Sequence, residues 1–84
     1  MNTVSVRYFA SIREALGAGE RVDLPAGATV ALLRDRLIER SPTHAAALAR
    51  GKALRCALDQ ALCEESAVVG EGAEVAFFPP VTGG

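Results

Sequence analysis

The segment TVALLRDRL, residues 29–37, carries the main helical pattern of the chain. Its apolar residues recur at intervals of three and four, and charged residues fall on the opposite side, which is typical of an amphipathic helix with one buried face. We expect Thr29 to cap the first turn, and the buried face to hold Val30, Leu33 and Leu37. Leu32 falls on the outer side, where it is expected to be an ordinary exposed residue or part of a partner surface.

The residues before this helix begin with a strand pattern. In TVSVRYF, residues 3–9, apolar and polar side chains alternate, which is the period of a half-buried strand. Its core-facing side chains are predicted to be Val4, Val6 and Tyr8.

A short helix and a second strand are predicted to follow. Over residues 11–17, Ser11 can cap a helical turn, Glu14 completes a capping box, and Gly17 is a natural end. Residues 21–24 then give a short strand before a Pro-Ala-Gly turn.

The residues after the main helix return to strands. Ser41-Pro42 ends that helix, and a second helical piece is predicted from His44 to Arg50. Residues 54–58 and 61–63 fit two short strands or a hairpin.

The last strand is predicted over residues 74–78, after a turn at Gly70-Glu71-Gly72, with Val75 and Phe77 on one face. Strands on both sides of one main helix predict an α+β fold, a mixed sheet curved around that helix.

Length and charge narrow the possible functions. The 84 residues suit one domain, predicted over residues 1–78 with an extended tail over residues 79–84. A net charge of -1 gives no basic surface for nucleic acid, and no apolar run approaches the roughly 18 to 20 residues that cross a bilayer. The first residues lack the features of a signal peptide, so we expect a cytoplasmic protein without a nucleic acid or membrane partner.

The chain lacks the motifs of an isolated enzyme. Cys56, Cys63 and His44 match no zinc pattern, and the two cysteines are expected to be reduced, small and buried or half-buried. His44 is expected to be solvated or to cap a helix, and the sequence assigns none of the three a role. No serine stands in a motif with histidine and acid, so we expect no catalysis by this chain alone.

The final residues, FFPPVTGG, are the exception. Prolines at 79 and 80 favour an extended arm, about 20 Å long from Pro79 onward. Gly83 and Gly84 have no side chains, so a terminal carboxylate can enter a narrow channel of a partner. Such a carboxylate is ionised and a poor electrophile, so it needs activation, for example by transfer of AMP. A sulfur nucleophile then gives a thiocarboxylate, and an amine gives an amide.

These residues resemble those of the ubiquitin-like β-grasp sulfur carriers. The ending EVAFFPPVTGG, residues 74–84, is similar to that of the small, sulfur-carrier subunits of molybdopterin synthase. VRYFA at residues 6–10, IREALG at 12–17 and GEGAEV at 70–75 are similar to the first strand, the short helix and the last turn of that family. The resemblance therefore covers nearly the whole chain.

The resemblance implies a role in molybdenum cofactor biosynthesis without a bound cofactor. A ubiquitin-activating-like adenylyltransferase uses ATP to adenylate Gly84, which becomes a thiocarboxylate and donates sulfur to cyclic pyranopterin monophosphate in the active site of the large subunit. Gly83 threads that active site, and the residues lining its entrance are Pro79, Pro80, Val81 and Thr82. Phe77 and Phe78 are expected to help form the apolar contact, in a heterotetramer of the two kinds of subunit.

Three alternatives stay open at this point. A sulfur carrier of thiazole synthesis shares the fold, but is usually shorter and lacks the Phe-Phe-Pro-Pro-Val-Thr run. A ubiquitin-like modifier forms isopeptide bonds, but usually has a basic residue just before its two glycines, where Val81 and Thr82 are neutral. A plain interaction module is the third.

Overall fold

The computed structural model describes residues 1–80, which form five strands and three helices. Along the chain these elements are β1 (Asn2–Tyr8), α1 (Ala10–Leu16), β2 (Gly19–Leu24), α2 (Val30–Ile38), α3 (Pro42–Leu48), β3 (Arg55–Leu58), β4 (Ala61–Cys63) and β5 (Glu74–Phe78).

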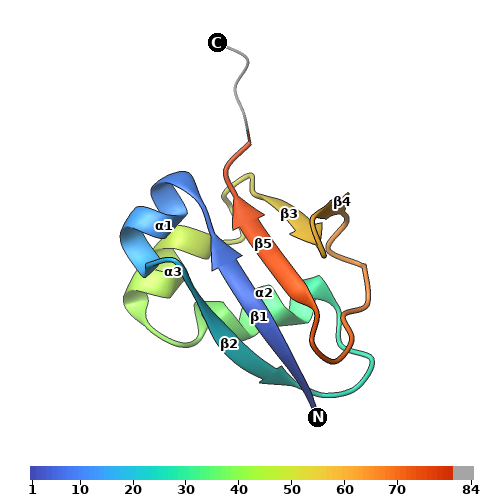
Figure 1. Cartoon of the computed structure of the whole chain (residues 1–84). Helices are drawn as coiled ribbons and strands as arrows, with labels where there is room; N and C mark the ends of the chain where they lie inside the picture. Colours follow the sequence, from blue (N-terminus) through green and yellow to red (C-terminus); the bar gives the residue numbers. More distant parts are fainter. Residues whose placement is uncertain (81–84) are drawn as a thin grey trace.

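The strands form one mixed sheet in the order β2-β1-β5-β3-β4 (Figure 1). The central strands β1 and β5 are parallel, with Val6 opposite Val75, and the other neighbours are antiparallel. The last strand of the chain is thus the middle strand of the sheet. The predicted α+β fold with a mixed sheet is confirmed.

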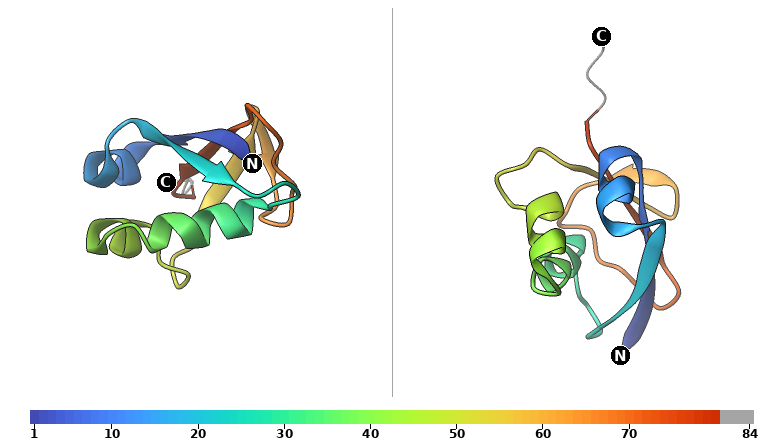
Figure 2. Two further views of the ribbon diagram at one scale, coloured as in Figure 1. Left: turned by 90° about the horizontal axis from the view of Figure 1, so that it is seen from below. Right: turned by 90° about the vertical axis from the view of Figure 1, so that its left-hand side faces the viewer.

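The helices α2 and α3 lie on one face of the sheet, and the core fills the space between them (Figure 2). Strand residues alternate across the sheet as the sequence predicts: Val4, Val6 and Tyr8 of β1, and Val75 and Phe77 of β5, are at most 1% exposed. From α2 the same core receives Val30, Leu33 and Leu37. The opposite face of the sheet is left open to solvent or to a partner.

Of two predictions for α2, the cap at Thr29 is confirmed and the exposed position of Leu32 is not. Thr29 caps the helix, since its hydroxyl accepts a hydrogen bond from the backbone of Leu32 at 3.2 Å. The outward placement of Leu32 is wrong, because its side chain is half-buried and packs against the core. The helix also buries the charged Arg34, which is 3% exposed.

The ends of the two short helices differ from the sequence prediction. The first begins at Ala10, and no side chain caps it, so the capping box of Ser11 and Glu14 is wrong. The turn comes earlier because the Phe9 N–H donates to the Phe77 carbonyl at 3.3 Å, which keeps the chain on the sheet up to that residue. Gly17 does end this helix, with a φ of 90° that favours glycine.

The α3 helix spans Pro42–Leu48 rather than residues 44–50, with Ser41 as its cap. It stops before Arg50 because the carbonyls of Leu48 and Ala49 accept hydrogen bonds from the Arg34 guanidinium.

Of the two alternatives for residues 54–63, two separate short strands or a hairpin, the structure has the hairpin. Asp59 and Gln60 have positive φ angles of 48° and 71°, as in the two-residue turns whose twist suits a hairpin. The predicted turn at residues 70–72 is confirmed: Gly72 has a φ of 77°, and its N–H donates to the Thr3 carbonyl at 2.9 Å.

Candidate functional site

The predicted tail starts from the middle of the sheet. Strand β5 ends at Phe78, and Pro79 and Pro80 follow, both half-buried. Phe77 is 1% exposed and belongs to the core, as its predicted place on one face with Val75 requires, so the direct part in the apolar partner contact that the resemblance implied for it is wrong. Phe78 points to the other face and is half-buried, as strand alternation predicts. The other predicted tail residues, Val81, Thr82, Gly83 and Gly84, lie outside the described residues.

Phe78 belongs to an apolar patch on the open face of the sheet, which we call the open-face patch. Strand pairing aligns Ala76 of β5 with Ala57 of β3, and Ala57 with Leu62 of β4. Leu62 is 71% exposed, a high value for a leucine. The open-face patch consists of Ala57, Leu62, Ala76 and Phe78, with Arg7 and Arg55 at its borders.

Sequence reasoning missed most of this patch. Ala57 and Leu62 were assigned to strands, but their neighbours depend on β3 pairing with both β5 and β4. Alternation could have placed each of them on an open face; the sequence carried no signal for the strand order that joins them. Large exposed apolar residues beside small ones favour contact with another protein.

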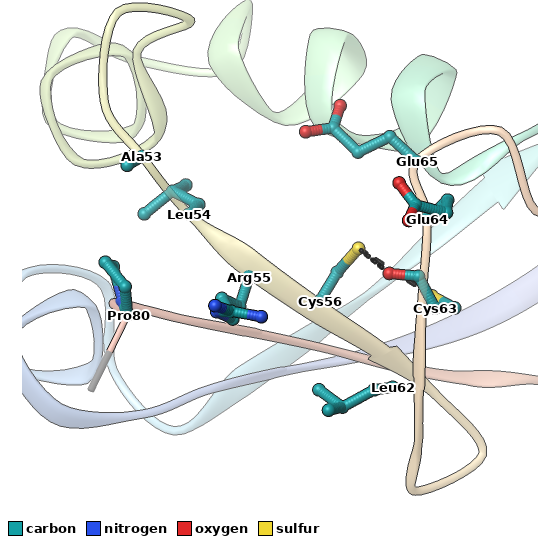
Figure 3. A pocket seen from close by; sticks show the side chains of 9 residues that line it. All are labelled: Ala53, Leu54, Arg55, Cys56, Leu62, Cys63, Glu64, Glu65 and Pro80. Carbon is teal, nitrogen blue, oxygen red and sulfur yellow. Dashed lines mark hydrogen bonds between the residues drawn. The ribbon is translucent and has the colours of Figure 1, made fainter. Parts of the chain in front are cut away.

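Two grooves flank the root of the tail. The first has a volume of about 610 Å³ and lies between the β3–β4 hairpin and Pro80 (Figure 3). Its lining residues are Ala53, Leu54, Arg55, Cys56, Leu62, Cys63, Glu64, Glu65 and Pro80. The second, of about 400 Å³, lies between α1, α3 and Pro79. Ala53 and Leu54 line both grooves, so the segment before β3 separates them.

The two cysteines face each other in the first groove. Cys56 is buried and Cys63 is half-buried, and their sulfur atoms are 3.7 Å apart. Burial, with the hydrogen bond to Cys63 and the charges nearby, raises the pKa of the Cys56 thiol to about 12. The expected buried or half-buried placement of both cysteines is confirmed.

A cluster of charged residues holds one wall of this groove. The buried Arg34 of α2 donates to the Glu65 carboxylate at 2.8 Å and to the carbonyls of Leu48 and Ala49 at 2.8 and 2.5 Å. Arg50 also pairs with Glu65. Burial acts to raise the pKa of Glu65, but the hydrogen bonds and charges of the two arginines outweigh it, and the pKa lies below its ordinary value. Glu65 is therefore a structural anion rather than a general acid.

His44 belongs to a second polar cluster. Its Nε2 lies 2.7 Å from the Glu20 carboxylate, and its Nδ1 lies 2.7 Å from the Ser41 hydroxyl. The expectation of a solvated residue is therefore wrong, because β2 brings Glu20 across from a distant part of the chain, whereas the contact with Ser41, the cap of α3, is in line with the helix-cap alternative. The Tyr8 hydroxyl donates to the same carboxylate at 2.6 Å, and Arg40 pairs with it.

This second cluster explains two pKa shifts. Burial, and then the hydrogen bond to Glu20, raises the pKa of the Tyr8 phenol far above its ordinary value. For Glu20, burial acts in the raising direction, but hydrogen bonds from Tyr8 and His44 and the charges of His44 and Arg40 outweigh it and lower its pKa. All these polar groups are satisfied, as expected for a cluster that joins β1, β2 and α3.

The described residues contain no cluster of metal ligands. Among residues 1–80, no three His, Cys, Asp or Glu side chains could hold one ion together. No helix in this range is long and apolar enough to cross a membrane.

Two known proteins of similar sequence carry the same name. The "Molybdopterin synthase sulfur carrier subunit" of Escherichia coli is 40% identical over 84 residues, covering 96% of this chain and 99% of that protein. The protein of the same name from Haemophilus influenzae is 39% identical over 82 residues, with the same coverage of both chains.

Solved structures agree on the fold. The crystal structure of SAMP1 from Haloferax volcanii is 26% identical, with a TM-score of 0.80 over 99% of this chain and 100% of that one. A protein-protein complex of subunits 1 and 2 of molybdopterin-converting factor from Helicobacter pylori contains a chain that is 23% identical, with a TM-score of 0.68 over 98% of this chain and 99% of that one. The ubiquitin-like β-grasp fold that the resemblance implied is therefore confirmed. A family model described as the ThiS family matches residues 6–84, so this chain belongs to the ThiS family, and its relatives include the sulfur carrier subunits of molybdopterin synthase.

Proposed function

We propose that this chain is the sulfur carrier of a molybdopterin synthase and carries the sulfur as a thiocarboxylate on Gly84. The observation that carries the proposal is the sequence PPVTGG directly after the central strand β5, in a chain that spans 99% of relatives named as such carriers. In this role the folded domain presents its own C-terminal tail to other proteins. This role needs no metal cluster, and residues 1–80 contain none.

The chemistry follows from the weak reactivity of a carboxylate. The Gly84 carboxylate oxygen attacks the α-phosphorus of ATP on an adenylyltransferase, and pyrophosphate leaves. A hydrosulfide ion then attacks the acyl carbon, AMP leaves, and a thiocarboxylate remains. The thiocarboxylate sulfur bonds to a carbon of a pterin precursor in the active site of the large subunit, and water then cleaves the acyl–sulfur bond and returns Gly84 as a carboxylate. Two charged carriers supply the two sulfurs of one dithiolene.

The open-face patch is the surface that we assign to partner docking. It includes Phe78, the last residue of the strand that leads into the tail, so a protein that covers Phe78 and Leu62 is positioned to receive the residues that follow Pro80. Arg7 and Arg55 at its borders add charge that orients an acidic partner surface. The structure from Helicobacter pylori, described as a complex of subunits 1 and 2, supports a large subunit as this partner.

A ubiquitin-like protein modifier is the second candidate. The specific observation in its favour is the TM-score of 0.80 to a structure described as small archaeal modifier protein 1, which is 24% identical and shares the fold. This chain has one lysine, Lys52, so self-conjugation has a single side-chain amine to use. If the wild-type chain forms crosslinks between its own copies and the Lys52→Arg variant forms none, the modifier is supported.

The test is the formation of dithiolene by the reconstituted system of this chain, a large subunit, an activating enzyme, ATP and a sulfur donor. One residue added after Gly84 moves the reacting carbon by about 3.3 to 3.6 Å, far more than group transfer tolerates. We expect the extended chain to keep its melting temperature and to deliver no sulfur. One residue added before Met1, which is 88% exposed, is the control and should leave delivery intact. Delivery by the extended, unprocessed chain would contradict the proposal.

A further inference from the structure

The two cysteines of this chain lie directly opposite each other on paired strands. In the antiparallel ladder of β3 and β4, Cys56 is the partner of Cys63. Cys56 belongs to the core and Cys63 packs against it, and the Cys56 thiol donates to the Cys63 carbonyl at 3.4 Å, as the dashed line in Figure 3 marks. The sulfur atoms are 3.7 Å apart, and no other cysteine exists in the chain.

This placement suits a disulfide bond. Residues directly opposite on antiparallel strands have Cα atoms about 4.5 to 5.5 Å apart, within the range of about 4.4 to 6.8 Å that disulfides need. The sulfur atoms must approach to about 2.05 Å, and rotation of the two side chains can supply this movement without a change in backbone conformation. The thiols therefore need an oxidant, but no refolding.

We propose that Cys56 and Cys63 form a dithiol that low-molecular-weight disulfides, such as oxidised glutathione, convert to an intramolecular disulfide in the folded chain. The Cys63 thiolate attacks one glutathione sulfur, the S–S bond of glutathione breaks, and one glutathione thiolate leaves. The Cys56 sulfur then gives up its proton and attacks the Cys63 sulfur, and the second glutathione thiolate leaves and is protonated. Two protein thiols are oxidised, and one oxidised glutathione is reduced to two thiols.

The order of these steps follows from exposure. Cys63 is half-buried and lines the groove beside Pro80, whereas Cys56 is 5% exposed. The raised pKa of the Cys56 thiol, about 12, keeps it protonated and makes it the weaker first attacker. Cys63 is thus the residue that meets the oxidant, and Cys56 resolves the mixed disulfide.

The modification is separate from the proposed transfer of sulfur through Gly84. The bond joins the two strands of the hairpin that forms one side of the groove, and Cys63 directly precedes the segment with Glu65. Oxidation therefore fixes this side of the groove beside Pro80 without consuming the tail carboxylate.

The experiment uses the full reduced chain with a graded ratio of oxidised to reduced glutathione, followed by acid quenching, alkylation and intact mass. We expect the wild type to lose two hydrogen atoms and both alkylatable thiols. Cys56→Ala should stop at one glutathione on Cys63, and Cys63→Ala should stay unmodified, since its remaining thiol is buried. Circular dichroism checks that each variant is folded, and the same titration in urea gives the unfolded reference.

The equilibrium constant for the disulfide should be about tenfold or more higher in the folded chain than in the urea-unfolded chain, because a bond that fits the fold is favoured by it. A constant no higher in the folded chain would overturn the proposal. A glutathione adduct that persists on Cys63 of the wild type would also overturn it. So would two thiols that remain alkylatable in the folded chain at a glutathione ratio that oxidises the unfolded chain. If a single-cysteine variant does not fold, the equilibrium constants of the folded and the unfolded wild type still test the proposal.

Discussion

Replacement of Arg34 by alanine tests whether the buried cation stabilises the walls of the two grooves. Its side chain is 4% exposed, donates to the Glu65 carboxylate, and satisfies the carbonyls of Leu48, Ala49 and Lys52. Removal of one partner from a buried charged pair costs about 3 to 5 kcal/mol. A chain of this size has a total stability of about 4 to 13 kcal/mol, so the variant is expected to be marginal.

The assay is urea unfolding followed by circular dichroism, with the melting temperature as a second measure. We expect Arg34→Ala to lose about 3 kcal/mol or more and to melt about 12 °C or more below the wild type. Arg36→Ala is the matched control, since Arg36 lies on the same helix but is exposed, and it should change stability by no more than about 0.5 kcal/mol.

A second variant separates the polar contacts from the packing of the side chain. Arg34→Met keeps an apolar stem of similar length but leaves the carbonyls and the Glu65 carboxylate without their donor. We expect it to recover less than half of the loss. A methionine variant as stable as the wild type would refute the reasoning, because the hydrogen bonds of Arg34 would then contribute no net stability.

The remaining predictions concern partner binding, pH and the thiols. Phe78→Ala should weaken binding to a large subunit by about 2 kcal/mol or more in calorimetry, and unchanged affinity would remove Phe78 from the interface. Because the pKa of Glu20 is lowered in the fold, its stabilisation is present above the ordinary value of 4.5 and is lost as the pH falls through the lowered value; the acid slope of stability should be flatter in Glu20→Gln. The single tyrosine, Tyr8, should show no phenolate absorbance at the ordinary pKa of 10.0 while the chain is folded, and stability should fall as the pH rises above that value. Replacement of both Cys56 and Cys63 by alanine should leave thiocarboxylate formation intact; a folded double variant that cannot be thiolated would show that a cysteine carries the sulfur.

Local sequence patterns predicted most of the fold because each element depends on its own residues. Alternation over residues 74–78 placed Val75 and Phe77 in the core, and the spacing after Thr29 gave the main helix. The expectation for Leu32 was wrong because its side chain also packs against the core, so the buried face of α2 is wider than the stripe that the residue spacing indicates. Helix ends were less predictable, since their caps compete with contacts from other segments, as the carbonyls held by Arg34 show.

The site was harder to predict because its parts come from distant segments. A charged residue on a helix normally indicates a solvated face, and the burial of Arg34 depends on carbonyls 14 and 15 residues away. The contact between Glu20 and His44 depends likewise on how β2 meets α3. The pairing of Cys56 with Cys63 was within reach, since a two-residue turn at Asp59-Gln60 sets that register once the hairpin is chosen.

The most direct test of the central claim is the mass of the C-terminal peptide after incubation with ATP, an activating enzyme and a sulfur donor. We predict that this peptide gains the mass difference between one sulfur and one oxygen atom, and that fragmentation assigns the gain to Gly84. Omission of ATP should abolish the gain, because the carboxylate is then never activated. A C-terminal peptide of unchanged mass under conditions that thiolate a known carrier, or a gain located on Cys63, would contradict the account.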